Sequence, residues 1–172
     1  LQALIAAVFL VAAVSPAASE ALGVANSFKR AKGWEESARR ILARAEAEGR
    51  AGPLQAIAVD DRFLFNSLAY YGRDWFARAG APPLKAWVRE AVPQNQAETF
   101  APLSAGETGR VLIASVVPEY RREIVWDFAR VVGVQDAPVR LDRKRTRDLQ
   151  LFVAEGYDRR PRDPISGLPT PP

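Results

Sequence analysis

The 172-residue chain contains no cysteine, no histidine and no methionine. Without cysteine, the chain can form neither a disulfide scaffold nor a zinc site with thiolate ligands. Without histidine, it lacks both the side chain that most often moves protons near neutral pH and the most common zinc ligand. The groups that remain for catalysis are carboxylates, hydroxyls, lysine, tyrosine and arginine. We predict no metal site.

The chain also has no charged residue before Glu20, and Leu1 to Ala18 is almost wholly apolar. Crossing a bilayer takes roughly 17–25 helical residues, so this run is at the lower limit. The chain begins with leucine instead of methionine, so we expect a truncated protein in which the apolar run can extend upstream of Leu1. We therefore predict a transmembrane helix over 1–19, the last span of a truncated protein, and a juxtamembrane linker over 20–33. Two alternatives stay open: a signal-peptide remnant, favoured by small residues near its end, and a buried core helix.

The residues after the linker predict one soluble α/β domain over 34–157. Apolar spacing alternates between the helical and the strand period. This order predicts a small, mostly parallel Rossmann-like sheet with helices on its faces and a C-terminal antiparallel hairpin at one edge. The tail over 158–172 is rich in proline and is predicted to be disordered. Helices are expected over 34–49, 62–80 and 118–133, and strands over 54–61, 84–88, 111–117, 138–142 and 149–157.

Polar residues follow several of the predicted strands. In parallel α/β sheets, ligands bind outside the carboxyl ends of the strands, so we predict that these residues converge and bind a sugar or a phosphate. Structural roles stay open as well, because Asp61 can cap a helix and 94–98 can be a solvated loop. No Gly-rich phosphate loop follows the first strand, which argues against a dinucleotide, and no cofactor is predicted. The candidate substrate-binding residues are Asp60, Asp61, Asn95, Gln96 and Glu98.

Basic residues gather near the end of the chain. Between Val139 and Asp163 there are eight lysines and arginines against five acidic residues, a net charge of +3. Such a patch can contact phosphate or anionic lipid headgroups, or it can be the solvated tip of a hairpin. Nucleic acid is not expected, because the segment RLDRKRTRD has no aromatic side chain for base stacking.

Three segments carry a resemblance to a known family: AIAVDDRFLFNSLAYYGRDWF, then LKAWV, then VLIASVVPEYRREI. Together they resemble the carboxy-terminal extramembrane region of bacterial glycosyltransferase family 39-type membrane proteins. These are relatives of protein O-mannosyltransferases and of the aminoarabinose transferase that modifies lipid A. The order of segments is similar from Leu1 to about Tyr157.

The resemblance implies a membrane enzyme that transfers a sugar from a polyprenyl-phosphate donor to a lipid or glycan acceptor. Family members carry their catalytic acidic residues in the first extramembrane loop, which this chain does not contain, so the resemblance implies no catalytic residue here. It also implies the bacterial inner membrane, with the soluble domain on the periplasmic side. Three basic residues argue for the cytoplasmic side by the positive-inside rule, although three glutamates partly offset them: Lys29, Arg30 and Lys32 against Glu20, Glu35 and Glu36.

Two classes of function stay open after this reading. The first is an accessory, non-catalytic domain of such a glycosyltransferase, with the lipid bilayer, the polyprenyl-phosphate sugar and the acceptor as partners. The second is a membrane-tethered module that binds sugars or the cell envelope without enzymatic activity. A free-standing enzyme is a third and weaker reading, because the sequence shows no convergent acid–base pair.

Overall fold

The computed structural model describes residues 1–15, 18, 21 and 32–172. They fall into two compact units, Leu1–Gly33 and Trp34–Pro172. The first unit holds α1 (Gln2–Val14), whose large apolar side chains from Leu1 to Val11 are exposed. Among the described residues, no helix is both long enough and apolar enough to cross a membrane.

The transmembrane helix predicted over 1–19 is therefore not seen. Helix α1 has 13 residues and ends before Ser15, whose backbone is extended at φ −118° and ψ 110°. The sequence continues with Pro16, and the residue before a proline is disfavoured in the helical region. Most of the predicted linker over 20–33 lies outside the described residues.

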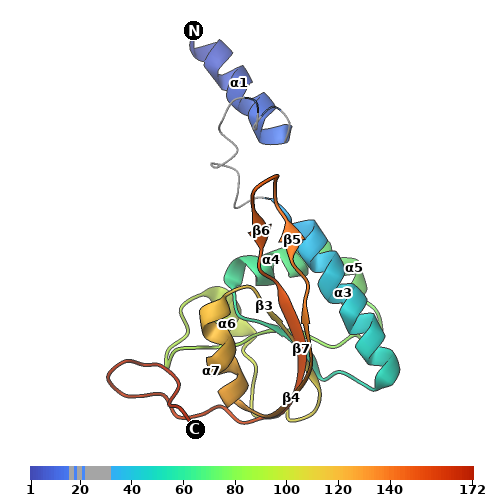
Figure 1. Cartoon of the computed structure of the whole chain (residues 1–172), viewed down its shortest axis with the longest axis vertical. Coiled ribbons are helices and arrows are strands. Elements are labelled where there is room, and N and C mark those ends of the chain that lie inside the picture. Colours follow the sequence, from blue (N-terminus) through green and yellow to red (C-terminus); the bar gives the residue numbers. More distant parts are fainter. Residues whose placement is uncertain (16–17, 19–20, 22–31) are drawn as a thin grey trace. The chain divides into compact units, whose positions relative to one another are not determined.

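The second unit alternates helices and strands, and Figure 1 shows them around one twisted sheet. The helical elements are α3 (Trp34–Ala51), α4 (Arg62–Tyr71), α5 (Arg73–Phe76), α6 (Gln96–Phe100), the 3-10 turn η2 (Pro118–Tyr120) and α7 (Arg121–Trp126). The strands are β1 (Ala56–Val59), β2 (Leu84–Ala86), β3 (Val111–Ser115), β4 (Phe128–Asp136), β5 (Val139–Arg140), β6 (Thr146–Arg147) and β7 (Gln150–Tyr157).

The main sheet has five strands in the order β2-β1-β3-β7-β4. The α/β class is confirmed, but the prediction of a mostly parallel sheet is wrong. The pairs β1–β2 and β1–β3 are parallel, whereas β7 is antiparallel to both β3 and β4. The sheet is mixed because β7 returns from a hairpin instead of from a crossover helix, and a hairpin reverses the chain.

A C-terminal antiparallel hairpin is present, but its first arm begins earlier than predicted. The helix expected over 118–133 ends at Trp126, and β4 begins at Phe128. Gly133 does not end a helix: it has φ +63° and lies where the β4–β7 register shifts between Val132 and Gln135. The β-branched residues around it favour a strand, and β7 supplies the partner.

The helix expected over 62–80 is also divided in two, at Gly72. A Cβ at this position would lie 2.6 Å from the carbonyl oxygen of Leu68. The Gly72 amide instead donates to that oxygen at 2.8 Å and closes α4.

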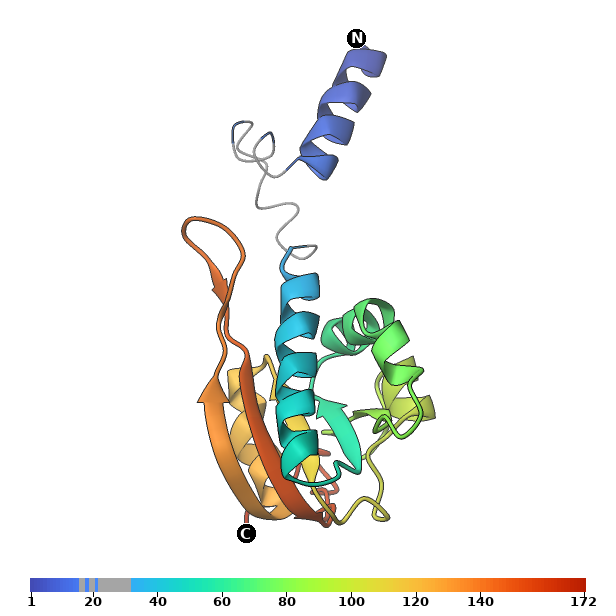
Figure 2. The ribbon, with the colours of Figure 1, turned by 90° about the vertical axis from the view of Figure 1, so that its right-hand side faces the viewer.

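Two apolar clusters cover the two faces of the sheet, because successive strand residues point to opposite sides. Ile57 and Val59 of β1 face α3 and α4, where they meet Ile41 and Leu68. Ala56 and Ala58 face the side of α7 instead, and there the cluster includes Trp87, Ile113, Ile124, Phe152 and Tyr157. In Figure 2, α3 and α7 lie on opposite sides of the sheet.

The tail over 158–172, expected to be disordered, has a defined course along the domain. Arg162 donates two hydrogen bonds to the carboxylate of Asp127, at 3.0 and 2.9 Å. Both side chains are buried, with 4% and 0% of their surface exposed. Arg162 also pairs with Pro169 through an isolated bridge. A buried ion pair is a specific contact that proline content does not reveal.

Candidate functional site

The carboxyl ends of β1 and β2 open onto a hollow of about 190 Å³, which we call the rim hollow. We call the edge of the sheet at which the parallel strands β1, β2 and β3 end the carboxyl edge. Of the five residues predicted from the sequence, four line the rim hollow, and Gln96 is not among its lining residues. It is lined by Asp60, Asp61, Arg62, Trp87, Arg89, Glu90, Gln94, Asn95, Glu98, Val117 and Tyr120.

Asp60 joins the ends of two parallel strands. Its carboxylate accepts hydrogen bonds from the Ser115 hydroxyl at 2.6 Å and from the amides of Val116 and Val117 at 3.0 and 3.2 Å. Burial raises the pKa of Asp60 from 3.8 to about 6, and these three hydrogen bonds oppose that rise. The carboxylate is therefore held in one place, with its donors supplied by the chain that leaves β3.

Asp61 is the N-cap of α4, as the structural alternative predicted. Its Oδ1 accepts from the amides of Phe63 and Leu64, each at 2.8 Å. An N-cap carboxylate satisfies amides that have no partner in the first helical turn. Because both bonds end on Oδ1, the second oxygen, Oδ2, is the acceptor that Asp61 can offer to a ligand.

Asn95 and Glu98 form a reciprocal cap at the start of α6. The Glu98 amide donates to Asn95 Oδ1 at 3.2 Å, and Asn95 Nδ2 donates to Glu98 Oε1 at 2.7 Å. The other glutamate oxygen accepts from the Gln94 amide at 2.7 Å. These contacts fix the loop that forms one wall of the rim hollow. Gln96, the first residue of α6, is exposed.

Two aromatic rings and an arginine complete the wall, and the sequence reading did not select them. The ring centroids of Trp87 and Tyr120 are 6.2 Å apart, and Arg89 Cζ lies 4.4 Å from the Tyr120 centroid. Arg89 pairs with Glu123 through two hydrogen bonds, at 2.6 and 2.8 Å. The hydrogen bond to Glu123 raises the pKa of Arg89. Trp87 directly follows β2, so the carboxyl-end rule applied to β2 could have found it.

The rim hollow can bind hydroxyl groups. Asp60 and Glu98 each accept hydrogen bonds at both oxygens from the chain itself, so the chain holds both carboxylates in fixed positions. Within the described ranges, no group of three or more possible ligands could hold a metal ion. Carboxylate and amide oxygens beside an aromatic ring can instead accept from hydroxyl groups while the ring packs on apolar carbon atoms.

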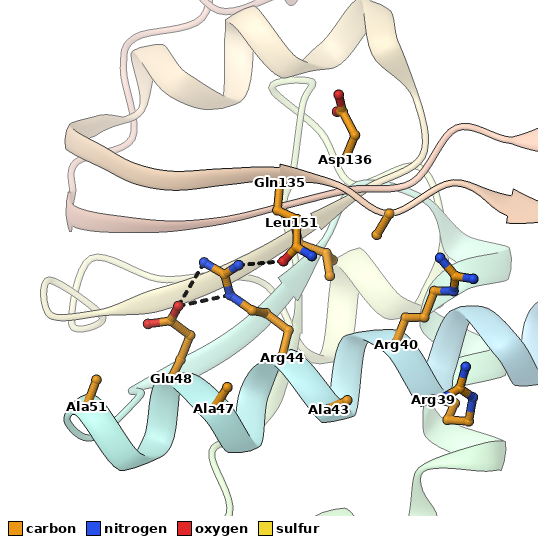
Figure 3. A pocket seen from close by; sticks show the side chains of 11 residues that line it. Arg39, Arg40, Ala43, Arg44, Ala47, Glu48, Ala51, Gln135, Asp136 and Leu151 are labelled. Carbon is orange, nitrogen blue, oxygen red and sulfur yellow. Dashed lines mark hydrogen bonds and ion pairs between the residues drawn. The ribbon is translucent and has the colours of Figure 1, made fainter.

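A larger hollow of about 590 Å³ lies between α3 and the β4–β7 arms, as Figure 3 shows. Its central arginine is already engaged: Arg44 bonds to Glu48 at 2.9 Å, to the Gln135 side chain at 2.6 Å and to the Gly133 carbonyl at 2.9 Å. Much of the remaining wall is alanine. Size alone favours this hollow, but convergent polar groups at strand ends are the better sign of a ligand site, so we select the rim hollow.

Comparison with known proteins gives no match: no family model, no curated protein and no solved structure is similar to this chain. The resemblance to glycosyltransferase family 39-type proteins therefore stays a prediction. The α/β fold and the rim hollow are observed in the described residues themselves.

Proposed function

We propose that the rim hollow binds a sugar group, and that the chain is the carboxy-terminal, non-catalytic domain of a membrane glycosyltransferase. The observation that carries this proposal is the lining of the rim hollow. Two aspartates, an asparagine and a glutamate lie beside a tryptophan and a tyrosine. Hydroxyl-rich ligands need fixed donors and acceptors, and the caps described above hold these side chains in place.

Its place in the larger enzyme follows from the resemblance and from α1. This helix exposes apolar side chains along its described length, and a helix that is apolar all round needs a lipid or protein environment. The proposal therefore puts the domain beside the bacterial inner membrane on the extracytoplasmic side. There it holds the acceptor, or the sugar of a polyprenyl-phosphate donor, for a catalytic centre in another part of the protein.

Two neighbouring glutamines allow a matched test of sugar binding. Gln94 lines the rim hollow, whereas Gln96 does not, and both are exposed. Saturation-transfer NMR on the purified chain would measure binding of a panel of hexoses, pentoses and amino sugars. We expect Gln94→Ala to weaken binding about threefold to tenfold, the value of one hydrogen bond, and Gln96→Ala to leave it unchanged. Equal binding by both variants would refute the assignment of the rim hollow.

The non-catalytic role makes a separate prediction. The isolated chain is expected to turn over no polyprenyl-phosphate sugar, and turnover would overturn this part of the proposal. In the longer protein that the proposal implies, Asp61→Ala should reduce acceptor use per folded molecule, and Arg39→Ala on the surface of α3 should not. If Asp61→Ala lowers only the thermal midpoint and leaves specific activity normal, the rim is scaffold.

A further inference from the structure

The β4–β7 hairpin extends beyond the main sheet as a basic tip, which we define as residues 140–147 and call the hairpin tip. Strands β5 and β6 pair at its base, and the Lys144 amide donates to Asp142 at 2.8 Å to form the turn. These eight residues include five lysines and arginines and one aspartate, a net charge of +4, equal to the net charge of the whole chain.

Three cations at the hairpin tip are available to a partner. In the part of the chain that the structure describes, the side chains of Arg143, Lys144 and Arg145 form no ion pair. Arg143 and Lys144 are exposed, and Arg145 is half-buried. Neighbouring like charges repel one another, so an anionic partner would relieve this repulsion.

The first turn of α3 lies at the same end of the domain as the hairpin tip (Figure 2), and aromatic side chains gather there. Arg147 Cζ is 3.4 Å from the ring centroid of Trp34, and the Trp34 and Phe63 rings stack at 6.5 Å. Phe63 keeps 43% of its surface exposed, with Arg62 Cζ 4.9 Å from its ring. Tryptophan and phenylalanine beside arginine and lysine are the combination found at the membrane–water interface.

The strand directions put the hairpin tip beyond the carboxyl edge of the sheet. Strand β4 is antiparallel to β7, as β3 is, so β4 runs in the direction of β3 and β1. The chain leaves β4 at Asp136 and enters the hairpin tip from that end. The rim hollow opens at the same edge, because Asp60 follows β1. Contact of the hairpin tip with a bilayer would therefore turn the rim hollow towards the same surface.

We propose that the hairpin tip binds the headgroups of an anionic bilayer, so that the carboxyl edge of the sheet faces the membrane. Charge complementarity selects the anionic lipid, and none of the hollows described above is lined by the exposed cations of the tip, so a broad surface fits it better than a small ligand. This proposal rests on the proposed function for what the rim hollow binds. The lipid contact itself is argued from the hairpin tip and can succeed or fail independently.

The absence of cysteine allows a site-specific test on the full chain. Thr146→Cys puts one thiol on the exposed tip, and Ala105→Cys puts one on the exposed loop before β3, at the opposite edge of the sheet. Each would carry an environment-sensitive dye, with vesicles of phosphatidylcholine alone or mixed with phosphatidylglycerol. We expect a blue shift and quenching by spin-labelled lipid for the dye at 146 only, and only with phosphatidylglycerol. Equal responses at 146 and 105, or none at 146, would overturn the proposal.

A charge series gives a second readout. The tip variant carries Arg143→Gln, Lys144→Gln and Arg145→Gln. The matched control carries Arg50→Gln, Arg73→Gln and Arg78→Gln, which remove the same charge elsewhere. The measured quantity is the partition coefficient for anionic vesicles divided by that for neutral vesicles. Helix α1 is uncharged, so its contribution is the same for both kinds of vesicle and cancels in this ratio. The tip variant is expected to lower this ratio about 100-fold, at roughly one decade or less per cation, and the control far less.

Salt and a competing polymer decide what kind of anion is bound. In about 1 M salt, where the Debye length is about 3 Å, the preference for anionic vesicles should be lost. A single-stranded oligonucleotide added without vesicles should not shift the dye at 146. A shift with the oligonucleotide and none with phosphatidylglycerol would assign the tip to nucleic acid and refute the lipid proposal.

Discussion

Arg162→Met would separate the tail from the domain at its most buried contact. Arg162 uses both terminal nitrogens on Asp127, while its Nε donates to the Arg89 carbonyl at 2.8 Å and one terminal nitrogen donates to the Val88 carbonyl at 2.9 Å. After the substitution, Asp127 keeps the Trp87 indole at 2.8 Å but has no counter-charge. Removing one partner of a buried pair costs about 3–5 kcal/mol, which is a large share of the about 5–15 kcal/mol that stabilises a typical domain.

Urea denaturation followed by tryptophan fluorescence measures this loss, since Trp87 reports on the same cluster. Arg159→Met is the control: Arg159 is exposed and donates one hydrogen bond to the Glu90 carbonyl, so its loss should be about 1 kcal/mol or less. In the Asp127→Asn/Arg162→Met double variant, we expect a smaller loss than the sum of the two single losses, with a coupling of about 1–3 kcal/mol. A loss below about 1 kcal/mol for Arg162→Met, or strict additivity, would refute the reasoning.

Three further predictions concern single positions. Burial raises the pKa of Asp60 to about 6, so the folded chain binds a proton there more readily than the unfolded chain. The free energy of unfolding should therefore fall as pH rises from about 4 to about 6 and level off above. Urea titrations across pH should show a flatter decline for Asp60→Asn. Asp61→Ala should cost about 0.5–2 kcal/mol and Asp61→Ser much less, because serine still caps α4, and thermal melts would contradict this if both variants matched. Gly156 has φ +70°, and a Cβ there would lie 2.8 Å from the Ala129 Cβ, so Gly156→Ala should destabilise the fold by about 1–3 kcal/mol. Calorimetry should find the control Gly106→Ala near neutral, because its Cβ would meet no atom within 4 Å.

The sequence predicted the elements whose pattern is local. Helix α3 has apolar residues at helical spacing, and Ala38, Ile41 and Ala45 are all buried. Strand β3 is an apolar run that is buried at every position. The segment around Phe128 was misread because it fits the helical period as well, and what decides it is pairing with residues 150–157, far along the chain. Single-sequence spacing does not contain that partner.

The residues of the candidate site were likewise predicted where a local pattern marked them and missed where it did not. The rule that ligands bind at strand ends found Asp60, Asp61 and two residues of the 94–98 loop, because each follows an apolar strand or a turn signal. Trp87 and Tyr120 were missed because an aromatic residue beside an apolar run is usually interpreted as core, and Trp87 does belong to the core as well as to the wall of the rim hollow. The same rule also selected Gln96, which is exposed and is not among the residues that line the rim hollow.

The late position of β7 in the chain affects how the protein is made. Strand β3 pairs with β1 on one side and with β7 on the other, so one of its edges stays open until residues 150–157 have left the ribosome. A nascent chain that ends earlier has the backbone amides and carbonyls of an apolar strand exposed, which is a template for aggregation. The edge strand β4 also pairs with β7 and has no partner in the sheet until β7 is made. A chain that lacks residues 150–157 would therefore expose the unpaired edges of two strands at once, and it should be prone to aggregation.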